Sequence, residues 1–243
     1  MKTGWLKDGP DGRDYKYSSI RMIAKIDDTV DLRKRMPEVN DQGLMSSCVG
    51  RALTNGIEFL RERKKRLVEL SALFAYYNAR AIDHLEHDDN GCVIRSAIKA
   101  VCINGICLEK KWPYKRTNVC ITPNEKAYKD AKTELITDYF RIEKGDITGI
   151  QAALTEGYPV IFGAILFKSF QMTDSEGIVK MPTFVDDNYL GGHCMLICGY
   201  TNKYFIVQNS WGKKWGAKGY CYMPFEYFSY AKNLTDDFWV IRH

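Results

Sequence analysis

Two kinds of hydrophobic pattern divide the chain. In the first half, apolar residues recur in steps of three and four, the spacing of one face of an α-helix. The first such stripe begins at Cys48 and comprises Val49, Ala52, Leu53, Ile57 and Leu60. Two more segments repeat this spacing. They are "ELSALFAYYNARAI", which Ser71 is expected to cap, and "VIRSAIKAVCING", which is expected to end at Gly105. The pattern predicts a mostly helical first half.

The second half changes to strand patterning. One short helix is predicted at "DITGIQAALTEG", and β-rich runs follow: "YPVIFGAIL", "HCMLICGY", "KYFIVQNSW", "GYCYMPF" and "FWVIRH". Helices followed by antiparallel-type strands are typical of an α+β fold with two lobes. We expect a helical lobe at about 33–137 and a β lobe at about 138–243.

The N-terminal region has little periodicity. Residues 1–47 are rich in Gly, Pro, Asp and Lys, so extended chain and turns are expected up to Cys48. We interpret residues 1–29 as an N-terminal extension, either a short propeptide remnant or a segment that crosses the domain.

Charge and hydropathy narrow the range of partners. The net charge of +5 includes one dense basic block, "RERKKR" at 61–66, which closes a predicted helix and is interpreted as a solvated face. No nucleic-acid partner is therefore expected. No apolar stretch reaches the roughly 20 residues of a membrane span, and the N-terminus lacks the apolar core of a signal peptide. An intracellular location is favoured if Met1 is the native start, and a lysosomal, vacuolar or secreted one if the chain is a processed fragment.

Eight cysteines are present, but their pairing cannot be deduced from spacing. No Cys-x2-Cys pair occurs, and Cys194 and Cys198 lie in a predicted strand. Neither a metal nor another cofactor is expected.

One cysteine and one histidine are candidates for catalysis. A thiol at the start of a helix faces free N–H groups and the positive end of the helix dipole, so the pKa of Cys48 is expected to be lowered. A thiolate also needs an imidazole as proton carrier. His84 and His87 lie in the acidic stretch "DHLEHDD" and His243 ends the chain, whereas His193 stands between two glycines and an apolar strand. His193 is the best candidate base.

Two amides complete a set of four roles. Asn209 follows a predicted strand beside two tryptophans and can orient an imidazole ring. Gln42, six positions before Cys48, offers an N–H donor to an oxyanion. Each residue taken alone also has a purely structural interpretation, a buried small hydrophobe for Cys48 and an Asn-Ser turn for Asn209.

Five separated segments, in order, resemble the papain-like cysteine peptidases. They are "VDLRKRMPEVNDQGLMSSC", "NGCVIRSAI", "WPY", "GGHCMLICGY" and "NSWGKKWGAKGY". The resemblance implies a papain-like two-lobed α+β fold over residues 30–243, with a helical lobe, an antiparallel β-barrel-like lobe and the active-site cleft between them. It also implies polypeptide substrates and cysteine endopeptidase activity.

The resemblance also assigns roles to the four candidates. Cys48 and His193 would form a thiolate and imidazolium pair that attacks a peptide carbonyl and gives a covalent acyl-enzyme. Asn209 would hold the His193 ring, and Trp211 would shield that hydrogen bond. Gln42 and the backbone N–H of Cys48 would bind the oxyanion.

Substrate contacts follow from the same comparison. The residues implied are Gly91, Cys92, Val93, Ile94, Gly163, Cys194 and Trp215. The backbone around Gly91 would pair with extended substrate, and Trp215 would line the leaving-group side. The main specificity pocket would be apolar or small, which favours a bulky hydrophobic side chain unless a residue near 235 alters its base.

The chain also departs from the family pattern. Val49 stands where a tryptophan usually follows the nucleophile, and Cys92 replaces the second glycine of the substrate-binding pair. Met45 and Asp89 occupy the positions of one common disulfide, so that bridge cannot form. Only about thirty residues precede the matching region, so either control is achieved differently or a longer propeptide was removed.

Several alternatives remain open at the level of sequence. The chain is also compatible with a catalytically silent papain-like binding protein, with a purely structural protein, or with a transpeptidase, aminopeptidase or isopeptidase that uses the same residues. A proteinaceous inhibitor or a propeptide is a further candidate partner. A monomer is expected by default.

Overall fold

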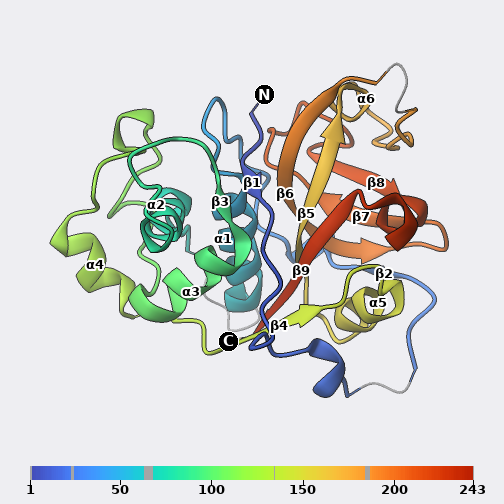
Figure 1. Ribbon diagram of the computed structural model, residues 1–243, viewed down its shortest axis with the longest axis horizontal. Coiled ribbons are helices and arrows are strands. Elements are labelled where there is room, and N and C mark those ends of the chain that lie inside the picture. Colours follow the sequence, from blue (N-terminus) through green and yellow to red (C-terminus); the bar gives the residue numbers. More distant parts are fainter. Residues whose placement is uncertain (1, 23–24, 63–67, 134, 184–186, 243) are drawn as a thin grey trace.

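The computed structural model describes residues 2–22, 25–62, 68–133, 135–183 and 187–242. Helices gather in one lobe and a twisted antiparallel sheet forms most of the other (Figure 1). The predicted two-lobed α+β fold is confirmed. All strands of the large sheet except Val30–Asp31 begin at or after Asp138, and the lobe bounds of about 33–137 and 138–243 stay a prediction.

The helices begin and end close to the sequence signals. They are α1 (Cys48–Glu62), α2 (Ala72–Ile82), α3 (Ile94–Asn104), α4 (Glu125–Ala131), α5 (Ile147–Thr155) and α6 (Lys168–Gln171). Single 3-10 turns are η1 (Tyr17–Ser19), η2 (Arg33–Arg35), η3 (Arg116–Asn118), η4 (Phe225–Phe228) and η5 (Tyr230–Lys232). Ser71 caps α2 by accepting a 3.1 Å hydrogen bond from the Phe74 N–H, and Gly105 ends α3 with a φ of 75°. Both predicted boundaries are confirmed.

The strands form one large sheet and one short pair. They are β1 (Trp5–Leu6), β2 (Val30–Asp31), β3 (Cys92–Val93), β4 (Asp138–Ile142), β5 (Val160–Phe167), β6 (Tyr189–Tyr200), β7 (Tyr204–Gln208), β8 (Tyr220–Pro224) and β9 (Thr235–Arg242). The large sheet has the order β4-β9-β5-β6-β7-β8, with β2 paired to β6. Among the described strands this order does not return to its beginning, so the sheet is not a closed barrel.

Helix α1 lies at the junction of the lobes. Its apolar side chains, such as Leu53 and Ile57, share one buried cluster with Leu196 and Trp239 of the sheet. Its polar end is also covered, because only 5% of Arg61 is exposed. The solvated-face interpretation is therefore wrong for Arg61, and residues 63–66 of the basic block lie outside the described residues.

The N-terminal segment crosses the front of the junction. In Figure 1 it is the dark blue chain that runs between α1 and β9 and passes beside both lobes. We refer to residues 2–14 as the strap. Its strand β1 pairs in parallel with β3, in the register Trp5 to Cys92 and Leu6 to Val93. A strand of two residues is too short to show an alternating hydrophobic pattern. It is held in place by its pairing with β3 and by burial of its side chains.

The described helices are all too short or too polar to span a bilayer.

Candidate active site

The four candidate residues come from different elements and meet at the junction of the lobes. Cys48 is the first residue of α1, His193 lies within β6, Asn209 directly follows β7, and Gln42 lies in the loop before α1. All four are almost completely buried, with at most 1% of each residue exposed. Cys48 Sγ accepts a hydrogen bond of 3.4 Å from the N–H of Cys194, the neighbour of His193 in β6.

The hydrogen bonds of Asn209 define the tautomer of His193. Asn209 Oδ1 accepts from the Ser210 N–H at 2.7 Å and lies 2.8 Å from His193 Nε2. Because this oxygen is an acceptor, the imidazole proton must reside on Nε2. His193 Nδ1 then carries a lone pair, and this buried nitrogen makes no hydrogen bond to the residues that the structure describes. It is free to take a proton from a thiol.

Gln42 is held with its N–H groups toward the cleft. Its Oε1 accepts a 2.6 Å hydrogen bond from Ser210 Oγ, which leaves Nε2 as the donor end. Nε2 donates to Met45 O at 2.8 Å and to Lys2 O at 3.0 Å. A peptide carbonyl of the strap therefore already occupies the position expected for an oxyanion.

Two tryptophans cover the imidazole. The rings of Trp211 and His193 lie 4.8 Å apart, and the rings of Trp211 and Trp215 lie 5.3 Å apart at 82°. Phe170 packs against both indoles. Trp211 therefore packs against the His193 ring, and its role in shielding the bond between His193 and Asn209 stays a prediction.

The predicted substrate-binding residues contact the strap. The Gly4 carbonyl accepts a 2.9 Å hydrogen bond from the Cys92 N–H, and the Gly4 N–H donates to Gly192 O at 2.9 Å. A Cβ at Gly91 would lie 2.2 Å from Gly4 O, so only glycine allows this approach. The cleft thus binds an extended backbone, although the bound chain is part of the same molecule.

The pocket expected for specificity is filled by Trp5. A Cβ at Gly163 would lie 2.0 Å from the Trp5 indole, and Cys194 stands opposite Gly163 in the sheet. Val93 is the register partner of Leu6, the residue after Trp5, and Ile94 is fully buried. Of the predicted pocket residues, Gly163 thus lies directly against the Trp5 indole, and Cys194 is its neighbour in the sheet.

The far end of the pocket is acidic. Trp5 Nε1 donates a 3.0 Å hydrogen bond to Asp237 Oδ2 on β9. Sequence reasoning left this position unaligned and missed Trp5, Lys2 and Asp237. One signal was available, since the charged pair Asp236 and Asp237 stands directly before the apolar and buried run Phe238–Ile241 of the same strand.

Burial favours the neutral forms of Cys48 and His193. Burial raises the pKa of the Cys48 thiol to about 12, although the N–H groups of Cys194, Val49 and Gly4 act against it. Burial also lowers the pKa of His193 to about 4, opposed by its hydrogen bond to Asn209. The lowered thiol pKa expected from the helix dipole is therefore not found with the strap in place, because desolvation of the thiolate outweighs the dipole.

The other histidines and cysteines stay apart from the site. His84 and His87 are exposed, as expected, and His243 lies outside the described residues. All eight cysteines are free thiols. The described residues contain no cluster of His, Cys, Asp and Glu that could hold a metal ion.

A thiol, an imidazole with a free Nδ1, an orienting amide and an oxyanion donor form the arrangement that thiol-dependent acyl-transfer enzymes use. Comparison with known proteins identifies the family within this class of enzymes. A model of the papain family cysteine proteases matches residues 26–232, and the chain belongs to this family. It is therefore a cysteine protease, a hydrolase.

Individual relatives agree with this assignment. An uncharacterized peptidase C1-like protein of Acanthamoeba polyphaga mimivirus is 34% identical over 269 residues, covering 98% of this chain and 86% of that protein. Cysteine proteinase 3 of Entamoeba histolytica is 30% identical over 213 residues, covering 84% and 65%. The crystal structure of xylellain, a cysteine protease from Xylella fastidiosa, has 36% identity and a TM-score of 0.89, covering 99% of this chain and 95% of that one.

Proposed function

We propose that the chain is a cysteine endopeptidase that uses Cys48, His193, Asn209 and Gln42. The observation that carries this proposal is the peptide carbonyl of Lys2, which accepts a hydrogen bond from Gln42 Nε2 in the same cleft as Cys48. A carbonyl bound in this way is polarised for attack by a nearby nucleophile. The cleft also binds backbone at Gly4, two residues from Lys2, through Cys92 and Gly192, so it holds an extended stretch of chain and not a terminal residue alone.

The proposed reaction has two halves. His193 Nδ1 takes the proton of Cys48, and the thiolate attacks the carbonyl carbon of the scissile bond while Gln42 Nε2 and the Cys48 N–H stabilise the oxyanion. The C–N bond breaks as the imidazolium protonates the leaving amine, which leaves a thioester. Water, deprotonated by His193, then attacks the thioester, the C–S bond breaks, and the carboxylic acid is released.

This mechanism requires that the strap first leave the cleft. Once water and a substrate replace the strap, the burial that now favours the neutral thiol and neutral imidazole is reduced. The free N–H groups at the start of α1 then favour the thiolate, and the thiolate in turn favours the imidazolium.

The pocket occupied by Trp5 supports a preference for a bulky aromatic side chain. The indole fits where Gly163 leaves space, and its N–H finds a carboxylate at Asp237. A hydrogen bond to a charged group contributes about 1.5 to 3 kcal/mol. We expect tryptophan at this substrate position to be favoured over phenylalanine by about tenfold or more in kcat/KM.

The test is a panel of internally quenched peptides that differ only at the pocket position, with products identified by mass spectrometry. It uses the wild-type chain and a Gly4→Val variant, in which the new side chain collides with Ser46 O and displaces the strap. We expect cuts at internal bonds, with Cys48→Ala folded but inactive in either background. Release of single terminal residues only, or turnover that survives Cys48→Ala, would sink the proposal.

A further inference from the structure

We propose that residues 2–14 form an autoinhibitory strap, which blocks the cleft in reverse chain direction and is latched to both lobes by a buried cluster of acids and arginines. This inference rests on the proposed function, since it concerns the same cleft. It differs from control by a removable propeptide because we propose that the strap leaves the cleft by opening of the latch, without cleavage of the chain.

The direction of the strap explains why it blocks the cleft without being a substrate. The carbonyl on Gln42 belongs to Lys2, and the side chain in the pocket belongs to Trp5, three residues later. The resemblance gives Trp215 to the leaving-group side, and we infer that the pocket filled by Trp5 serves the acyl side, so that a substrate's pocket residue precedes its scissile carbonyl in the chain. The strap therefore runs opposite to a substrate and presents no correctly oriented scissile bond to Cys48.

The strap is fitted too closely to be an accidental contact. Four glycines in the walls of the cleft allow its approach, because a Cβ at any of them would lie 2.0 to 2.5 Å from a strap atom. These glycines are Gly91, Gly163, Gly191 and Gly192. On the strap itself, a Cβ at Gly4 would lie 2.0 Å from the backbone oxygen of Ser46. The close contact between strap and cleft therefore requires glycine both in the walls of the cleft and in the strap.

A hydrogen bond and an ion pair fix the first residue. The Lys2 ammonium lies 3.0 Å from Asp89 Oδ2. Asp89 is itself held, because its Oδ1 accepts from the Ser46 N–H and from the Tyr76 hydroxyl, each at 2.9 Å. Lys2 is therefore held at two points, by its carbonyl on Gln42 and by its ammonium on Asp89.

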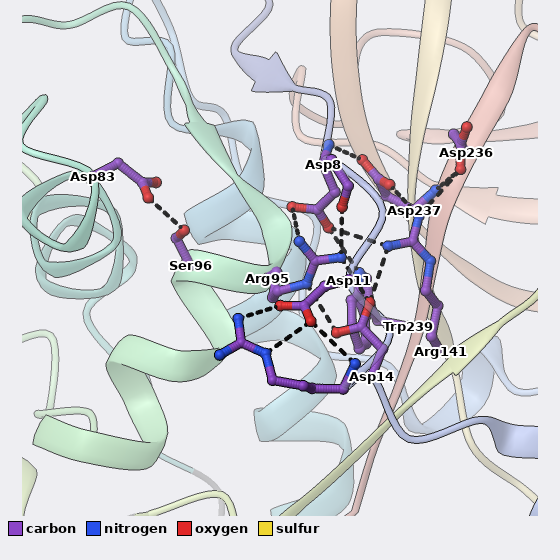
Figure 2. Close-up of polar contacts among 12 residues, drawn as sticks. Asp8, Asp11, Asp14, Asp83, Arg95, Ser96, Arg141, Asp236, Asp237 and Trp239 are labelled. Atoms are coloured by element: carbon purple, nitrogen blue, oxygen red, sulfur yellow. Dashed lines mark hydrogen bonds and ion pairs between the residues drawn. The ribbon is translucent and has the colours of Figure 1, made fainter.

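The latch lies beyond the pocket, where the strap passes from one lobe to the other. Figure 2 shows Asp8 and Asp14 facing Arg95 of α3 and Arg141 of β4. Asp14 accepts two hydrogen bonds from Arg95, at 2.9 and 2.7 Å, and lies 3.3 Å from Arg141. Asp8 lies 3.6 Å from Arg95 and 3.9 Å from Arg141. The arginines thus tie the strap to both lobes at once.

The β lobe contributes a further acid of the latch, Asp237. Asp237 accepts from the Asp8 N–H at 2.8 Å and from Arg141 at 2.7 Å (Figure 2). The same Asp237 accepts from the Trp5 indole. Trp5 in the pocket and the latch beside it therefore share the carboxylate of Asp237. Removal of Trp5 from the pocket should weaken the latch, and opening of the latch should weaken the binding of Trp5.

The experiment measures access to Cys48 in the full chain. Wild type, Gly4→Val and Gly12→Val are treated briefly with iodoacetamide, and the adduct on Cys48 is quantified by peptide mass spectrometry. A Cβ at Gly12 meets nothing within 4 Å, so Gly12→Val is the matched control. We expect Cys48 in Gly4→Val to react at least tenfold faster than in wild type or in the control, with circular dichroism unchanged.

A second pair of variants tests the latch separately. Asp14→Asn removes the carboxylate that accepts hydrogen bonds from Arg95, whereas Asp11→Asn removes one whose side-chain hydrogen bonds, among the described residues, come from Arg13 of the strap and which acts on Arg95 through charge alone. We expect alkylation of Cys48 to rise at least threefold in Asp14→Asn and to stay at the wild-type rate in Asp11→Asn.

The outcomes separate the two proposals. Equal alkylation rates in wild type and in folded Gly4→Val overturn the strap, even if peptides are cleaved. Faster alkylation of Cys48 in Gly4→Val with no cleavage of any peptide supports the strap and overturns the endopeptidase. Cutting of the chain between residues 2 and 14 at the onset of activity would overturn release without cleavage.

Discussion

At the scale of single residues, hydrogen bonds decide what each polar group in the cleft can do. Ser210 has two roles, since its N–H orients Asn209 and its hydroxyl orients Gln42. The imidazole and the oxyanion donor are thereby positioned from one point of the loop after β7. Sequence patterns identified Asn209 and Gln42 separately, but they gave no indication that Ser210 joins them, because a serine after an asparagine is equally typical of a turn.

Replacement of Gln42 tests the role of the donor. Gln42→Glu keeps the volume but replaces the N–H groups with acceptor oxygens, so the oxyanion loses one hydrogen bond. We expect kcat to fall by about 10²- to 10³-fold. Alkylation of Cys48 should not slow, because the Lys2 carbonyl loses the same donor. Ser210→Ala, which keeps the Gln42 N–H groups, is the control, and an equal fall in kcat in both variants would argue against direct donation.

At the scale of elements, the sequence predicted the long segments and missed the short ones. Helix α1 begins at Cys48 as its apolar stripe indicated, and β5 to β9 follow the apolar runs. The pairing of β1 with β3 joins Trp5 to Cys92 across 87 positions, and neither two-residue strand contains a period to detect. The acid at Asp237 was missed for a related reason, because only the fold reveals that it faces Trp5.

Loss of the α2 cap should weaken the helical lobe without opening the cleft. Ser71 Oγ accepts from the Phe74 N–H and also donates to Trp112 O at 2.6 Å, and the residue is fully buried. We expect Ser71→Ala to lower the free energy of unfolding by about 1 to 2 kcal/mol. Chemical denaturation measures this change, and Cys48 alkylation should stay constant.

The exposed cap of α4 provides the comparison. Asn124 Oδ1 accepts from the Ala127 N–H at 3.0 Å, and the Asn124 side chain is exposed and makes no second hydrogen bond to the residues that the structure describes. Asn124→Ala should cost about 0.5 to 1 kcal/mol. If both variants lost the same stability, burial of the Ser71 hydroxyl would have no measurable effect.

At the scale of the whole molecule, the latch makes the seating of the strap depend on pH. Burial raises the pKa of Asp8 to about 7, with the charge of Asp237 adding to the shift and Arg95, Arg141 and the Trp239 indole opposing it. A released strap exposes Asp8 to water, where its ordinary value is 3.8. The seated strap therefore binds more protons than the released one between these values, and its affinity falls as pH rises from about 4 to about 7.

Release of the strap should therefore be easier at pH 8 than at pH 5. The measurement is the alkylation rate of Cys48 in wild type divided by the rate in Gly4→Val, since the ratio cancels the intrinsic pH dependence of the thiol. We expect this ratio to rise between pH 5 and pH 8. Asp8→Asn removes the titrating group and should give a flatter ratio. A ratio that falls as pH rises would contradict the role of protonated Asp8 in holding the strap.

A seated strap also has a consequence for every measured affinity of this cleft. Strap and ligand exclude each other on Gln42 and Cys92, so a ligand binds only those molecules whose cleft is open, and its apparent Kd is multiplied by the inverse of that fraction. A strap seated in about 99% of molecules weakens all ligands by about 100-fold, whatever their sequence. Since the competitor is tethered, dilution does not relieve it. The rank order of peptides in the wild-type chain is thus informative, while their absolute constants all carry one common factor.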